Sequence, residues 1–166
     1  MKPADLQVMI DYNYWANARL LAGAEQVPWE KLCAPTTLSW GSVRDVLVHQ
    51  LSAEWIWRMR IAEGRSPAAL LRPDEFTSFA QLHSRFAEEE TALRGHVAGW
   101  TEADLDAVVH YQSTSGKPFT TVRWQILFHV INHGTQHRAE IAHFLTEYGA
   151  SPGDVDLIML VRRAEQ

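Results

Sequence analysis

Three histidines lie at four-residue intervals in one segment: His129, His133 and His137. In a helix, residues at this spacing project from nearly one face, and neighbouring Cβ atoms are about 5–6 Å apart. Two imidazoles at that separation can bind one metal ion. The outer pair is separated by about 12 Å along the helix axis, so one ion can take at most two of the three. The spacing leaves both neighbouring pairs open, and it predicts that a further ligand comes from another segment.

His49 is the best source of that ligand, because it lies on the apolar stripe of a helix expected over residues 43–63. Three neutral imidazoles would leave a coordination position for water or substrate, as in catalytic metal sites. Zinc, nickel and Fe(II) all accept imidazole ligands, so the identity of the divalent ion stays open. The alternative interpretation is that these histidines are hydrogen-bonded core residues, which is the more common role of a single histidine on an apolar stripe.

Apolar residues at helical spacing predict four long helices, over residues 4–26, 43–63, 78–99 and 121–148. Ser42 and Ser78 are expected to cap two of them. Residues 101–120 and those just after them read as two short strands joined by a polar turn, and 154–163 as a short final helix. The sequence therefore predicts an all-α four-helix bundle with a β-hairpin inserted before the last long helix, as one domain over residues 1–166.

Several polar residues accompany the predicted site. Asn13 and Asn17 lie on the stripe of the first helix, where they either hydrogen-bond a neighbouring helix or face a polar cavity. Gly134 costs about 1 kcal/mol relative to alanine inside a helix, which close approach of another helix or a ligand would explain. Arg138 points off the metal face, and we expect it to pair with a carboxylate. Two carboxylates, those of Glu54 and Glu140, could orient an imidazole. An ordinary surface or interhelix charge is the simpler interpretation of both.

The composition restricts the class of protein. The net charge of −5 argues against a long basic surface for nucleic acid. Cys33 is the sole cysteine, which excludes an intrachain disulfide and favours a cytoplasmic protein. No apolar run reaches the roughly 18–20 residues of a membrane helix. Core packing is the simpler use of the tryptophans, and the candidates for an apolar pocket are Trp15, Trp55 and Trp57.

Four segments together resemble one known family: residues 12–17 (YNYWAN), 48–51 (VHQL), 132–138 (NHGTQHR) and 154–157 (DVDL). This is the DinB family, also described as DinB/YfiT-like metalloenzymes, and the likeness runs from near residue 4 to near residue 161. The resemblance implies a four-helix bundle, often homodimeric, with one divalent metal ion. It implies the ligands His49, His133 and His137. By the same resemblance His129 lies close to the site without being a first choice as ligand, and it is the nearest candidate for a general base.

The resemblance also favours a class of function. Relatives of this fold include transferases and isomerases that use low-molecular-weight thiols, so the preferred hypothesis is metal-assisted transfer of a thiol to a small-molecule substrate. Hydrolysis by activated water comes second. The alternative is a metal-binding stress protein without turnover, which would share the same ligands. The family name records damage inducibility, and the acidic balance argues against a partner nucleic acid.

Overall fold

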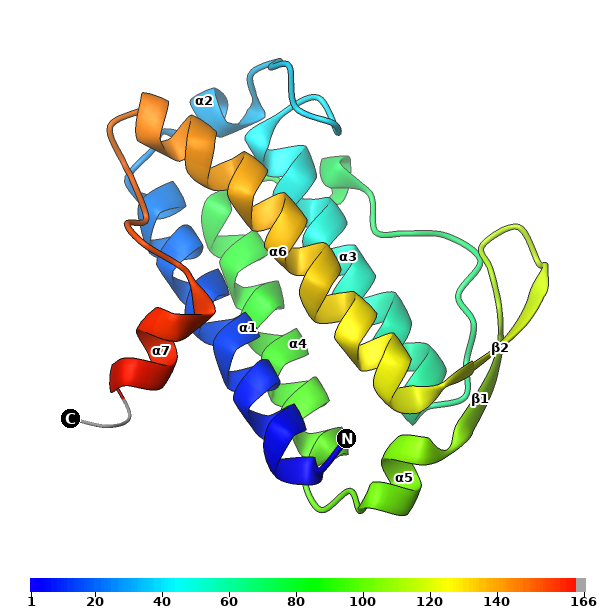
Figure 1. Cartoon of the computed structure of the whole chain (residues 1–166). Coiled ribbons are helices and arrows are strands. Elements are labelled where there is room, and N and C mark those ends of the chain that lie inside the picture. The colour runs from blue at the N-terminus through cyan, green and yellow to red at the C-terminus, as the bar shows by residue number, and fades with distance from the viewer. Residues whose placement is uncertain (164–166) are drawn as a thin grey trace.

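The structure is a computed structural model that describes residues 1–163, so the last three residues of the expected domain lie outside the described part. It is mostly helical, with one two-stranded antiparallel hairpin (Figure 1). The elements in chain order are α1 (Pro3–Glu25), α2 (Trp29–Cys33), α3 (Val43–Ala62), the 3₁₀ helix η1 (Pro73–Glu75), α4 (Phe79–Val97), α5 (Glu102–Asp106), β1 (Val108–Gln112), β2 (Pro118–Val122), α6 (Arg123–Glu147) and α7 (Leu157–Arg163).

The four long helices predicted from the sequence are present and pack side by side. Helix α6 contacts both α3 and α1, and α4 contacts the same two helices. Both predicted caps are confirmed, since the hydroxyl of Ser42 accepts from the backbone N–H of Asp45 and that of Ser78 from Gln81. Between residues 1 and 163 no helix combines the length and the apolar content needed to cross a membrane.

The structure corrects several predicted boundaries. The sequence predicts only a connection over residues 28–41, but this segment includes α2, which buries Leu32. Helix α5 precedes the hairpin and is likewise only five residues long. Elements this short contain too few positions to show a hydrophobic period. Helix α6 begins at Arg123 rather than residue 121, because Val122 still pairs with Val108 in the hairpin.

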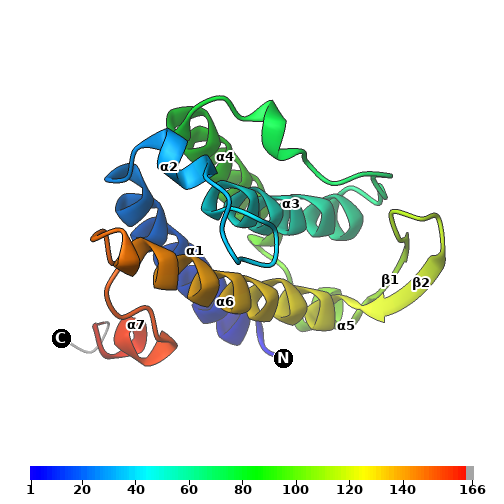
Figure 2. The same cartoon turned by 90° about the horizontal axis from the view of Figure 1, so that it is seen from above.

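The long helices bury three apolar clusters. One includes Leu20 of α1 and Leu51 of α3, a second includes Ile10 of α1 and Ile126 of α6, and the third, which is smaller, lies between α1 and α6. The hairpin extends from one end of α3 and α6 (Figure 2). It is tied to the segment after α3 by a hydrogen bond from the Gln112 backbone N–H to the Ser66 hydroxyl.

Candidate metal centre

The facing sides of α3 and α6 bring three of the predicted histidines together. The Nε2 atom of His133 lies 3.1 Å from that of His49 and 3.2 Å from that of His137. One ring nitrogen from each of the three lies within 4.8 Å of the others, so this cluster could hold a metal ion. Its members come from two helices, as the sequence predicted. We call His49, His133 and His137 the histidine cluster.

The hydrogen-bonding capacity of the rings fits a cation better than a metal-free cluster. His137 contacts a carboxylate oxygen of Glu140 through Nδ1 at 2.9 Å. A carboxylate only accepts hydrogen bonds, so the proton of neutral His137 lies on Nδ1 and its Nε2 presents a lone pair. His133 Nε2 can carry one proton at most, yet it faces two other Nε2 atoms. A cation would accept all three lone pairs.

Two further residues hold the imidazoles in place. The indole of Trp40 stacks on His49 with ring centroids 3.8 Å apart. The hydroxyl of Ser39 donates to Glu140 at 3.0 Å, which holds the carboxylate that orients His137. Both residues belong to the segment between α2 and α3. The sequence predicts no role for Ser39 and predicts only that Trp40 packs this connection onto the helices, whereas Trp40 is 45% exposed and stacks on His49.

The electrostatic surroundings keep two of the rings neutral. Burial lowers the pKa of His49 to about 4, and the neighbouring His137 contributes in the same direction. Burial and the neighbouring His137 likewise lower the pKa of His133 to about 4. Neutral imidazole is the form that binds metal, so near pH 7 these rings need no deprotonation before an ion binds.

The sequence profile of the DinB family matches residues 1–166. The chain belongs to the DinB family. It is also 23% identical over 165 residues to Protein DinB of Bacillus subtilis (strain 168), an alignment that covers 95% of each chain. The resemblance stated from the sequence is therefore confirmed at the level of the family.

In this DinB-family chain, residues from three of the four signature segments also meet in a buried polar network beside the histidine cluster, where Gln50 Nε2 donates to Asn17 Oδ1. Arg138 Nη1 donates to the side-chain oxygens of Asn13, at 2.6 Å, and Asn17, at 3.0 Å. The amide groups of both asparagines donate in turn to Glu54 of α3. Burial raises the pKa of Glu54, and the bonds from Asn13 and Asn17 oppose that rise. The network joins α1, α3 and α6 beside the site.

This network decides several predictions. The asparagines hydrogen-bond neighbouring helices, as the simpler interpretation held. The expected carboxylate salt bridge of Arg138 is wrong, because its guanidinium bonds the asparagine side chains and the Thr135 hydroxyl. Gly134 has the close approach of another helix that was expected, since a Cβ there would lie 3.1 Å from Asn13 Oδ1 of α1; it would also lie 2.7 Å from Arg138 Nη1 of its own helix. Glu54 is an interhelix charge, whereas Glu140 contacts an imidazole and is more than a surface charge.

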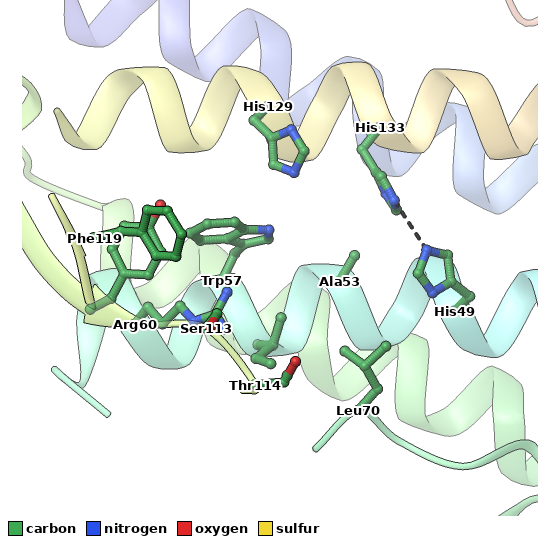
Figure 3. A pocket seen from close by; sticks show the side chains of 12 residues that line it. His49, Ala53, Trp57, Arg60, Leu70, Ser113, Thr114, Phe119, His129 and His133 are labelled. Carbon is green, nitrogen blue, oxygen red and sulfur yellow. Dashed lines mark hydrogen bonds between the residues drawn. The ribbon is translucent and has the colours of Figure 1, made fainter. Parts of the chain in front are cut away.

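A cavity of about 350 Å³ opens beside the histidine cluster, between α3, α6 and the hairpin. His49 and His133 line one end, and Phe119 and Arg60 lie toward the other (Figure 3). The walls between them are largely apolar, and of the three tryptophans considered for such a pocket only Trp57 lines this one. Sequence reasoning missed the hairpin as a wall, because the pairing of two strands does not reveal which helix they cover.

His129 lines the same cavity but does not join the histidine cluster. Its ring meets Trp57 edge-on at 5.4 Å and lies 5.6 Å from the ring of His133. Burial lowers the pKa of His129. The structure thus favours His133–His137 over His129–His133 as the converging pair, and it leaves His129 in the pocket wall, where it remains a candidate general base.

Removal of the Glu140 carboxylate tests how the His137 ring is oriented. We expect Glu140→Ala to weaken metal binding by about 10–100-fold with the helical content unchanged, since such outer partners typically have effects of this size. Glu147→Ala is the matched control, because Glu147 contacts the exposed His143 on the same helix, four residues away. Metal affinity measured by competition with a chelator compares the two variants. Equal affinities would show that Glu140 does not support the site.

Proposed function

We propose that this chain binds one divalent transition metal ion through His49, His133 and His137 and is a metal-dependent enzyme that activates a thiol. The observation that carries the proposal is the convergence of the three imidazoles of the histidine cluster, two of which, His49 and His133, line one end of a largely apolar cavity. The bound ion would supply Lewis acidity that favours the anionic form of a thiol, or of water in the hydrolytic alternative. Zinc, nickel and iron are all compatible with this donor set.

The protein's own residues would orient and enclose the reaction. Glu140 and Trp40 hold two of the rings, while Trp57 and Phe119 exclude water from the pocket walls. His129 is our candidate to accept a proton, because it lines the pocket next to His133. The proposal includes a DinB-like four-helix bundle formed by the long helices, a cytoplasmic location and a homodimer. These three elements rest on the family resemblance and on the composition.

A thiol-consumption assay tests the proposal. Protein reconstituted with zinc, nickel or Fe(II) would be mixed with cysteine or glutathione and chlorodinitrobenzene, whose aryl carbon accepts the sulfur while chloride leaves. We expect consumption above that of free ion and above that of metal-treated His137→Ala. If no loaded form consumes thiol faster than these controls, while metal binding is retained, the non-catalytic metal-binding protein becomes the better description.

A further inference from the structure

Arg60 is a buried cation without a carboxylate partner, in the wall of the cavity beside the histidine cluster. It is only 7% exposed. Among residues 1–163 no ion pair or hydrogen bond involves its guanidinium, and its Nε atom is buried without a hydrogen-bond partner. Burying a charge without a partner is unfavourable, and most buried charges in proteins are paired. An unpaired guanidinium in a pocket wall therefore calls for an explanation.

Arg58, two residues earlier on α3, shows what a structural arginine looks like in this chain. Its guanidinium binds both carboxylate oxygens of the buried Glu89 and also contacts Glu63. Arg60 instead stacks on aromatic rings, 4.5 Å from the centre of Trp57 and 5.3 Å from that of Tyr111. Stacking uses the flat faces of a guanidinium and leaves its in-plane N–H donors available.

The position of Arg60 in the cavity indicates what those donors would bind. His49 and Arg60 line the same face of α3 and are 11 residues apart, which is about 16 Å along the helix axis. Ala53 and Trp57 lie between them, and Arg60 is at the hairpin end, away from His49 (Figure 3). The cavity therefore has an apolar middle, imidazoles at one end and a cation at the other.

We propose that this pocket takes a small molecule with an apolar body and a carboxylate or sulfonate group, and that Arg60 pairs with that group. The planar donors of arginine match the two oxygens of such an anion. The inference rests on the proposed function for the chemistry at the opposite end, where the histidine cluster would face the reacting group. Binding of the anion at Arg60 itself requires no metal.

Two fluorescent probes with one aromatic skeleton test the inference. Anilinonaphthalene sulfonate carries an anionic group, and phenylnaphthylamine is the same skeleton without it. We expect wild-type protein to bind the anionic probe more tightly, and the Arg60→Gln variant to bind it about tenfold more weakly or worse, with little change for the neutral probe. Arg60→Lys keeps the charge and should retain part of the preference. Arg72→Gln, which changes an exposed arginine paired with Asp74, is the control and should bind like wild type.

Thermal unfolding separates binding from a structural role. Because Gln removes an unpaired buried cation, Arg60→Gln should unfold at or above the Tm of wild type. Equal affinity of wild type for the two probes overturns the inference without any variant. A large fall in Tm together with an unchanged probe preference also overturns it, since Arg60 would then serve the fold.

The same probes distinguish this inference from the proposed metal chemistry. In His49→Ala we expect loss of bound metal but retention of the preference for the anionic probe, because Arg60 lies at the other end of the cavity. If His49→Ala retains its metal and the preference still depends on Arg60, the metal site is wrong and the anion site stands. If the metal is lost as expected and Arg60→Gln leaves the preference intact, the anion site is wrong and the metal site stands.

Discussion

His137→Ala is expected to abolish stoichiometric metal binding while the helical fold is retained. His137 is 4% exposed, and its Nε2 is held toward His133 by the Glu140 contact at Nδ1. Removing a ligand leaves two imidazoles, so the loss should exceed the roughly 10–100-fold effect of losing an outer hydrogen-bond partner. Elemental mass spectrometry on protein purified without a metal-binding tag measures the ion content. His49→Ala should behave the same way, because its ring comes from the opposite helix.

His129→Ala is the matched control for this experiment. It removes an imidazole at the same four-residue spacing, on the same helix, whose ring is outside the histidine cluster. We expect this variant to hold about as much metal as wild type. If His129→Ala loses its metal and His137→Ala retains it, the chelating pair is His129–His133 and not His133–His137. If wild-type protein holds no metal, even after reconstitution with nickel, zinc and Fe(II), these histidines are core residues and not metal ligands.

The histidine cluster was largely predictable because it is encoded by spacing. A helix places every fourth residue on one face, so the sequence indicated both candidate pairs and an inward-facing His49 on a second helix. The spacing alone could not choose between the pairs His129–His133 and His133–His137, because both have the same four-residue separation; only the family resemblance implied His133 and His137. The choice depends on which histidines of α6 lie opposite His49 of α3, and this is set by how the two helices pack.

The contacts that complete the site were less predictable because they come from segments that show no regular hydrophobic repeat. Trp40 and Ser39 reach the site from a connection, and Phe119 from a hairpin whose placement over α3 is a tertiary feature. Arg138 shows a second limit. Its position directly after His137 correctly indicated that it points off the metal face, but the sequence could not show that two asparagine side chains stand between it and Glu54.

Arg138→Met should destabilise the protein by about 3–5 kcal/mol, the range expected when one partner of a buried charged network is removed. Arg138 is 1% exposed and Glu54 is 2% exposed. Without the guanidinium, the carboxylate of Glu54 loses a nearby cation, and Asn13 and Asn17 lose a donor to their side-chain oxygens. Urea denaturation of the metal-free protein gives the free energy of unfolding separately from any contribution of a bound ion.

A double-mutant cycle shows whether the network is the cause. Glu54→Gln removes the charge that Arg138 balances, so the double variant should recover part of the stability lost in Arg138→Met.

Gly134→Ala tests the packing around Arg138 independently, because a Cβ would lie 2.7 Å from Arg138 Nη1 and 3.1 Å from Asn13 Oδ1. It should lower stability in wild type despite the roughly 1 kcal/mol preference of a helix for alanine. The loss should be smaller in the Arg138→Met background, because the flexible thioether chain can move away from the added methyl group. Simple additivity in both combinations would mean that Arg138 stabilises the fold by filling space, and that the charges and amides around it act independently.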